Sequence, residues 1–357
     1  MKKQTSRHLT VLILLFLSYS ANSQINTVEF SFTFDSIKYS GLINLPKGRE
    51  AKSMVIIVPG SGKTDFVKGN WYYDLRAFFV NLGFAVCAWD KAGCGKSEGK
   101  FDNQQPVQSS AKEALAAIAE LRHQKISGSD KIGLWGISRA GWICPLIIEE
   151  DSLIAFWISV SGVDSLENSN YLLEANLKIN GKSDSEVSLL MAERLEGSRI
   201  IRNGGSFEKY VAATQNLKED SLNITLFGKY TQETYLQDQK WFMDRKNRFS
   251  YDEKSGSMIF FPGFDKILKK IPCPVLAIFG EKDAQVDWQK TMTLYKETIG
   301  KTPQAEISIK SFPDCNHNIQ KCETGGLFEN LEKYNWQTCD GYYDTIKLWV
   351  QNHGFIK

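Results

Sequence analysis

Hydrophobic and polar residues follow two patterns in the first 160 positions of the chain. Residues 27–34 and 36–45 alternate polar and apolar side chains, which predicts a hairpin of two half-buried strands. Continuous apolar runs are typical of strands covered on both faces, and they follow at 53–58, 84–89, 131–137 and 153–160. Segments with helical spacing separate these runs. Strands that alternate with helices predict a mostly parallel, doubly wound α/β sheet.

The alternation stops after residue 162 and returns near residue 272. The intervening segment is polar and helix-like, and Ser183 to Glu186 match a capping box ahead of a helix. An apolar run at 274–279 then starts a second series of strands and helices, which ends with a helix at 342–353. We therefore predict a core of residues 24–162 and 272–357. The segment 163–271 is predicted to be a helical cap over the carboxyl-terminal edge of the sheet.

The first 23 residues match a secretory signal peptide. Three basic residues (Lys2, Lys3 and Arg7) precede an apolar run at 9–17, and small residues occupy positions 21 and 23, which a signal peptidase recognises. The apolar run is too short to span a bilayer comfortably, and no other segment approaches twenty apolar residues. We expect cleavage near Ser23/Gln24, export to the periplasm or the cell exterior, and no stable membrane anchor.

Charge and composition exclude some partners. Without residues 1–23 the chain carries 40 basic and 41 acidic side chains and has no basic patch, so nucleic acid is not an expected partner. Two Gly-Lys pairs, at 62–63 and 95–96, resemble the end of a phosphate-binding loop. That motif needs a further glycine five residues earlier, where this chain has Ile57 and Asp90. Nucleotide binding is therefore also not expected.

The sequence Gly-Ile-Ser-Arg-Ala-Gly at 136–141 lies between a predicted strand and a predicted helix. A nucleophilic serine in a Gly-x-Ser-x-Gly motif occupies this position, on a sharp turn at the edge of a sheet. The small residues Gly136 and Ala140 would let neighbouring backbone pass close to the turn. Ser138 is the predicted nucleophile, and an ordinary serine in a strand-to-helix turn is the alternative.

A serine nucleophile needs a histidine to accept its proton and a carboxylate to orient that histidine. His317 follows a predicted strand, whereas the other histidines lie in the signal segment (His8) or near helix ends (His123 and His353). The alternative is that His317 is a solvated loop histidine without a catalytic role.

Asp283 also follows a predicted strand, in a Gly-x-x-Asp turn. Its rivals for the role of the carboxylate are Glu281, Asp287 and Asp314. The order Ser138, Asp283, His317 is the chain order of the triad in α/β-hydrolases.

Acyl transfer also needs N–H groups that bind the developing oxyanion. The backbone N–H of Arg139, directly after the serine, is one candidate. The N–H of Ser61, in the Pro-Gly-Ser-Gly turn at 59–62, is the other. A tight turn without this function is the alternative for the second candidate.

Seven cysteines require an account in an exported protein. Cys87, Cys144 and Cys273 lie in or beside apolar segments, and Cys94 lies in a glycine-rich turn. The other three lie late in the chain: Cys315, Cys322 and Cys339. We predict a disulfide between Cys322 and Cys339, with Cys315–Cys322 as the competing pair.

The chain resembles the α/β-hydrolases of the bacterial exported esterase and serine-aminopeptidase-like group. The matching segments are 41–46, 58–62, 90–99, 136–141, 274–283 and 316–317, which cover the sheet from end to end but not the cap. Two positions depart from the pattern of the group: Pro59 replaces the usual histidine before the oxyanion glycine, and Ala140 replaces the second elbow glycine. The resemblance implies an enzyme that needs no cofactor or metal.

The predicted function is hydrolysis of carboxylic esters, with a small acyl compound as substrate, because most members of the resembling group are esterases. A serine peptidase or aminopeptidase is the first alternative. It would need a carboxylate in the cap to bind a substrate amine, and Glu167, Glu174 and Glu193 are candidates. A non-catalytic binding protein on the same fold is the second alternative.

Overall fold

The computed structural model describes residues 25–166, 168–245, 250–252, 256–259, 261–303 and 305–356. The predicted signal peptide (1–23) and the cap candidate Glu167 lie outside these ranges. Within them, no helix combines the length and the apolar character that crossing a bilayer would require.

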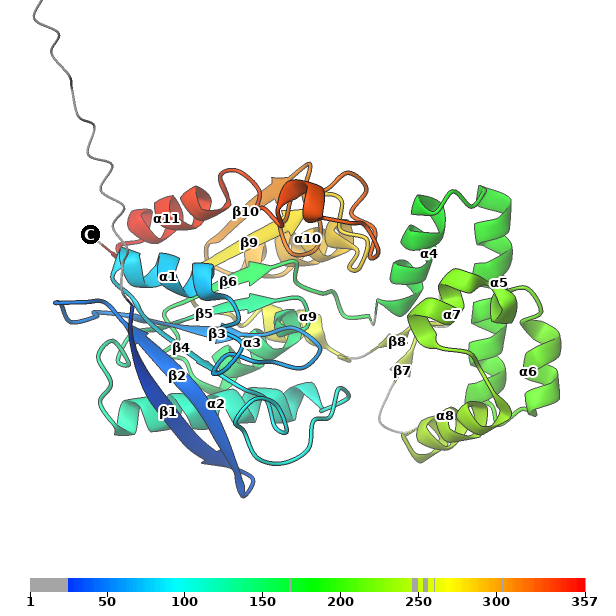
Figure 1. The fold of residues 1–357 in the computed structure, drawn as a ribbon, viewed down its shortest axis with the longest axis horizontal. Coiled ribbons are helices and arrows are strands. Elements are labelled where there is room, and N and C mark those ends of the chain that lie inside the picture. The colour runs from blue at the N-terminus through cyan, green and yellow to red at the C-terminus, as the bar shows by residue number, and fades with distance from the viewer. Residues whose placement is uncertain are drawn as a thin grey trace, which may run out of the picture.

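A twisted sheet forms the centre of the core (Figure 1). In the described ranges it contains eight strands in the order β1-β2-β4-β3-β5-β6-β9-β10. β1 and β2 form the predicted antiparallel hairpin, β2 is antiparallel to β4, and every other neighbouring pair is parallel. The strands span Asn26–Phe34 (β1), Ile37–Leu45 (β2), Met54–Val58 (β3), Ala85–Trp89 (β4), Ile132–Ile137 (β5), Phe156–Val160 (β6), Val275–Gly280 (β9) and Ile307–Phe312 (β10). The prediction of a mostly parallel α/β sheet is confirmed.

Helices cover both faces of this sheet, which explains why its central strands are apolar throughout. Side chains alternate between the faces along a strand. In β3, Ile56 joins the core cluster beneath α2, α3, α9 and α10, whereas Ile57 joins the cluster beneath α1 and α11. These helices span Tyr73–Leu82 (α1), Val107–His123 (α2), Ala140–Glu150 (α3), Phe264–Leu268 (α9), Trp288–Glu297 (α10) and Tyr342–Asn352 (α11).

A group of helices stands beside the core, beyond one edge of the sheet (Figure 1). They span Ser169–Ile179 (α4), Asp184–Arg202 (α5), Phe207–Ala213 (α6), Ser221–Phe227 (α7) and Gln232–Arg245 (α8). Ser183 and Glu186 form the predicted capping box at the start of α5. We refer to α4–α8 as the cap.

The chain enters and leaves the cap along paired extended segments. A short hairpin is formed by β7 (Ser250–Tyr251) and β8 (Met258–Ile259), and Ile259 also bridges to Leu166 on the entering segment. The helix α9 lies in the range predicted for the cap, but its residues Phe264 and Leu268 are buried in the core cluster with α3. Its packing therefore ties the end of this range to the core.

Candidate active site

Four loops that carry predicted site residues follow parallel strands. The turns after β3, β5, β9 and β10 contain Ser61, Ser138, Asp283 and His317, respectively. Because the carboxyl ends of parallel strands lie at one edge of a sheet, these residues are brought to the same edge.

Ser138 lies on a sharp turn between β5 and α3. Its φ angle is 58°, in the left-handed region that non-glycine residues seldom adopt. Its N–H donates to the Val160 carbonyl at 2.9 Å, and its own carbonyl accepts from the Gly141 N–H at 2.7 Å. These bonds hold the serine in the backbone conformation of a nucleophile elbow.

Steric crowding requires small residues around Ser138. A Cβ on Gly136 would lie 2.7 Å from the Cys144 sulfur and 2.9 Å from the Ala140 Cβ. Gly136 is therefore the position that needs glycine, while the methyl group of Ala140 fits beside it. A Cβ on Gly60 would lie 3.1 Å from the Ser138 Cβ, so the turn after β3 passes directly against the serine.

Asp283 and His317 form a buried pair. The Asp283 Oδ2 lies 2.7 Å from the His317 Nδ1, and the two side chains are 0% and 7% exposed. The other carboxylate oxygen, Oδ1, accepts from the N–H groups of Gln285 at 2.8 Å and Val286 at 2.9 Å. The His317 carbonyl accepts from the Ser161 hydroxyl at 2.6 Å. Since Nδ1 faces the carboxylate, Nε2 is the ring nitrogen left to exchange a proton with a nucleophile.

The rival carboxylates are bound elsewhere. Glu281 accepts from the Ser311 hydroxyl at 2.6 Å, and Asp314 pairs with Lys282 at 2.9 Å. Asp287 accepts from the Lys290 N–H at 3.1 Å, at the start of α10. The structure therefore brings Asp283, and not its rivals, to the imidazole.

The two candidate oxyanion donors are the backbone N–H groups of Ser61 and Arg139. Among the residues that the structure describes, neither the Ser61 N–H nor the Arg139 N–H donates to a protein acceptor. Arg139 begins the turn into α3, and its buried guanidinium donates to the Gln105 carbonyl. Neither donor is therefore occupied by the described part of the protein, which is a condition for binding an oxyanion.

Two further groups of residues, which the sequence pattern did not indicate, support the site. Lys91, two residues after the end of β4, donates from Nζ to the carbonyls of Gly60 at 2.5 Å and Gly62 at 2.9 Å. From α4 of the cap, the Tyr171 hydroxyl donates to the Asp283 carbonyl at 2.9 Å, and the Asn176 amide donates to the Ala284 carbonyl at 3.0 Å. Only the position of Lys91 after a central strand was visible in the sequence.

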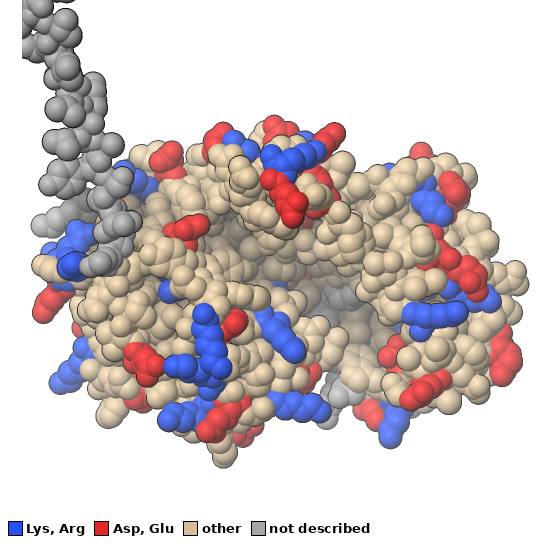
Figure 2. All heavy atoms as spheres, viewed as in Figure 1, with Lys and Arg blue, Asp and Glu red and all other residues tan. Residues whose placement is uncertain are grey.

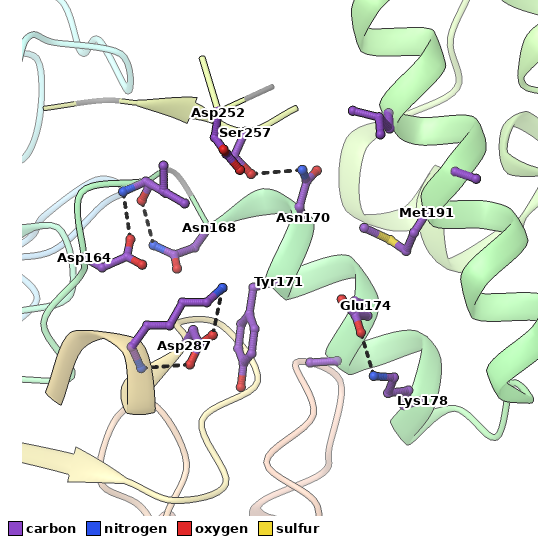
Figure 3. A pocket seen from close by; sticks show the side chains of 15 residues that line it. Asp164, Asn168, Asn170, Tyr171, Glu174, Lys178, Met191, Asp252, Ser257 and Asp287 are labelled. Carbon is purple, nitrogen blue, oxygen red and sulfur yellow. Dashed lines mark hydrogen bonds and ion pairs between the residues drawn. The ribbon is translucent and has the colours of Figure 1, made fainter. Parts of the chain in front are cut away.

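A hollow separates the core from the cap (Figure 2). It contains a cavity of about 860 Å³, which the cap helices α4 and α5 share with loops of the core (Figure 3). Tyr171 lines this cavity while its hydroxyl contacts the Asp283 loop, so the cavity adjoins the acid side of the site. None of the three triad candidates is among the residues that line it.

The cavity is lined by more acidic than basic side chains. Its carboxylates are those of Asp164, Glu174, Asp252 and Asp287, and its cations are Lys178 and Lys290. Glu174 pairs with Lys178 at 2.6 Å, and Asp287 pairs with Lys290 at 3.1 Å. Asp164 is buried, and burial raises the pKa of its carboxyl above the ordinary value.

The predicted disulfide is wrong. Cys339 bonds to Cys315, with 6.3 Å between their Cα atoms, and Cys322 is a buried free thiol. The Cys339 N–H donates to the Ile319 carbonyl at 2.9 Å, which lays residue 339 along the segment that follows His317. The Cys322 thiol instead points at the Asp314 carbonyl, 3.6 Å away. The disulfide therefore anchors the loop of the catalytic histidine candidate.

No set of three or more His, Cys, Asp or Glu residues is arranged to hold a metal ion in the described part of the chain.

A family model described as X-Pro dipeptidyl-peptidase (S15 family) matches residues 17–309. The chain belongs to this family. The matched range contains Ser138 and Asp283 but ends eight residues before His317. The assignment of His317 therefore rests on its contact with Asp283. The S15 family has the α/β-hydrolase fold, and the protein is a hydrolase of that fold.

Solved structures agree with this fold. An esterase of Pyrococcus furiosus, Pf2001, has a TM-score of 0.51 at 12% identity, over 92% of this chain and 93% of its own. DcsB, solved in complex with its substrate analogue, has a TM-score of 0.52 at 15% identity, over 92% of this chain and 97% of its own. No curated protein sequence matches the chain significantly.

Proposed function

We propose that this S15-family protein is an exported serine hydrolase that cleaves carboxylic esters through an acyl-enzyme intermediate. The observation that carries the proposal is the buried contact of 2.7 Å between Asp283 Oδ2 and His317 Nδ1, at the same sheet edge as the elbow serine Ser138. A serine, a histidine and an aspartate in these positions supply the three groups that acyl transfer requires.

Acylation begins when the His317 Nε2 accepts the hydroxyl proton of Ser138. The serine oxygen forms a bond to the ester carbonyl carbon, and the carbonyl electron pair moves onto its oxygen. The N–H groups of Ser61 and Arg139 bind this oxyanion. His317 then returns the proton to the departing alkoxide, the C–O bond to the alcohol breaks, and an acyl-serine remains. Asp283 stabilises the imidazolium throughout.

Deacylation repeats these steps with water. His317 accepts a proton from a water molecule, whose oxygen attacks the acyl carbon of the ester on Ser138. Collapse of the second oxyanion breaks the bond to the serine oxygen, which takes the proton back from His317. The products are a carboxylic acid and the regenerated enzyme.

Ester cleavage is favoured because Glu174 and Glu193, the two predicted amine-binding carboxylates that lie in the described ranges, are engaged in local contacts. Glu174 pairs with Lys178 on the same helix, and Glu193 accepts from the N–H groups of Asn216 at 2.9 Å and Leu217 at 2.7 Å. An ester needs no such anchor, and its alkoxide is a better leaving group than an amide nitrogen. The likeness in fold to the esterase Pf2001 also supports this choice.

A serine peptidase that releases residues from a free amino terminus is the second candidate. The description of the matching family, X-Pro dipeptidyl-peptidase, supports it. So does the buried carboxyl of Asp164, which lines the cavity and could bind a substrate amine. This candidate differs from the first in the leaving group and in the need for a charged amino terminus.

A paired substrate panel tests the two candidates. Purified protein is assayed with p-nitrophenyl esters of increasing acyl length and with Xaa-Pro p-nitroanilides, with Ser138→Ala as the control. We expect kcat/KM to be highest for the esters and to vanish with the variant. Higher kcat/KM for the anilides, lost in Asp164→Asn, would replace the esterase by the peptidase. Failure of a fluorophosphonate probe to label Ser138 would favour a non-catalytic binding protein.

A further inference from the structure

Lys91 makes a pair of contacts that the three catalytic residues do not explain. It follows β4, and its side chain reaches the turn after the neighbouring strand β3, where Nζ donates to the carbonyls of Gly60 and Gly62. Ser61 lies between these two carbonyls. The same turn passes directly against Ser138, because a Cβ on Gly60 would lie 3.7 Å from the serine Oγ. One ammonium group therefore fixes the backbone on both sides of the candidate oxyanion donor.

The ammonium of Lys91 is neutralised by no direct partner. In the described ranges no carboxylate lies within ion-pair distance of its Nζ. The charged and titratable groups that act on it are the guanidinium of Arg139, the carboxylate of Glu113 and the thiol of Cys94. Burial, and then the positive charge of Arg139, lower the pKa of Lys91 to about 8.

The covalent geometry of the turn links Lys91 to the oxyanion. The Gly60 carbonyl and the Ser61 N–H belong to the same planar peptide unit. A charged donor on the carbonyl oxygen draws electron density from that unit and makes its N–H a stronger donor. The bond to the Gly62 carbonyl fixes the other side of the turn, so the N–H keeps its direction while the charge on the substrate oxygen develops.

We propose that Lys91 is the positioning residue of the oxyanion hole: its ammonium holds the Gly60 and Gly62 carbonyls and polarises the Ser61 N–H toward the oxyanion. This inference rests on the proposed acyl-transfer function. It concerns the transition state and not the bound substrate, because the oxyanion forms only during the reaction. Loss of the ammonium should therefore lower kcat and leave KM nearly unchanged.

Two substitutions at Lys91 distinguish an effect of the ammonium on catalysis from an effect on the stability of the fold. Lys91→Met removes the donor and the charge, whereas Lys91→Arg keeps both, with a pKa above the range of the assay. Lys63→Met is the matched control, because Lys63 lies one residue beyond Gly62 and its Nζ lies 6.0 Å from the ring of Phe101. Each variant is assayed with a short p-nitrophenyl ester, labelled with a fluorophosphonate probe, and checked for folding by thermal denaturation.

We expect Lys91→Met to lower kcat and the labelling rate about 10- to 100-fold, somewhat less than the direct loss of an oxyanion donor. KM should change by less than about twofold, and Lys63→Met should behave as wild type. In the wild type kcat should fall as the pH rises through about 8, because Lys91 loses its proton there. Lys91→Arg should retain more activity than Lys91→Met and lack this alkaline fall.

The possible results distinguish a failure of the role proposed for Lys91 from a failure of the proposed acyl-transfer function. If the wild type is labelled at Ser138 but folded Lys91→Met is labelled equally fast, the role of Lys91 is wrong and the proposed function stands. If Lys91→Met does not fold, the pH profile of Lys91→Arg decides, and an unchanged alkaline fall overturns the inference. A wild type that neither hydrolyses the ester nor takes the label overturns both.

Discussion

The core and the cap of this hydrolase are stabilised in different ways. Core strands such as β3 and β9 are buried on both faces, between two large clusters of apolar side chains. The cap has two small clusters, one around Leu173, Leu190 and Leu217, the other around Ile201, Tyr210 and Tyr235. Because the free energy of burial grows with the apolar area removed from water, burial stabilises the core more than the cap.

The same difference appears at the site. All three triad candidates stand on core loops, and backbone N–H groups fix Asp283 from within its own loop. The cap adds single hydrogen bonds from Tyr171 and Asn176 and one wall of the cavity. We infer that the core determines the reaction and that the cap determines which substrates reach it.

The largest expected effect comes from the nucleophile in the core. Ser138→Ala should lower kcat by about 10⁴- to 10⁶-fold, because no other group then forms the acyl-enzyme. Steady-state kinetics with a p-nitrophenyl ester, beside a mass-spectrometric search for the acyl adduct, measures this. An adduct on another residue would remove Ser138 from the mechanism.

Ser138→Gly serves as the companion variant. Glycine adopts the observed φ of 58° without a Cβ penalty, so this inactive variant should be about 1 kcal/mol more stable than wild type. Denaturant unfolding checks the sign, and a less stable glycine variant would contradict the strained elbow.

The next effect concerns the histidine loop. Replacing Cys315 and Cys339 together by serine should lower the free energy of unfolding by about 3 kcal/mol, because the bond closes a loop between residues 24 positions apart. Urea unfolding without reductant measures the change. Cys322→Ser is the control and should shift stability by less than about 1 kcal/mol, since its thiol makes only a weak contact. An equal loss in both variants would contradict this pairing.

The disulfide also shows which features of the fold and the site could be predicted from the sequence and which could not. The apolar runs predicted the parallel strands, and strand ends followed by Ser138, Asp283 and His317 predicted which side chains gather at one edge. Spacing alone could not choose among three late cysteines, because the fold of residues 317–339 decides which sulfurs meet. The contacts of Lys91 could not be predicted for a similar reason, because its partners are backbone carbonyls in the turn after another strand.

A smaller effect is expected at the contact between cap and core. Asn176 is fully buried, donates to the Ala284 carbonyl and accepts from the Leu327 N–H at 2.8 Å. Asn176→Ala leaves both groups without this partner and should cost about 2 kcal/mol of stability. It should change kcat/KM only a few-fold, because the cap shapes the cavity and does not react.

Asn180→Ala is the matched control, because Asn180 is the exposed C-cap residue of the same helix and its side-chain amide donates to the Asn176 carbonyl at 2.7 Å. Hydrogen exchange at residues 283–286 should rise in Asn176→Ala and not in this control. Unchanged exchange in both variants would show that α4 does not support the acid loop.

The smallest effect should come from a site within the cap alone. Ser183 is the N-cap residue of α5. Its hydroxyl accepts from the Glu186 N–H, and its own N–H donates to the Glu186 carboxylate at 2.9 Å. Ser183→Ala removes one half of this capping box and should cost about 1 kcal/mol of stability. Since α5 supplies Met191, Ala192 and Leu195 to the cavity wall and none of the triad candidates, kcat on a short ester should stay within about twofold of wild type. A large fall in kcat for the short ester would mean that the cap takes part in the chemistry. It would contradict the inference that the core alone determines the reaction.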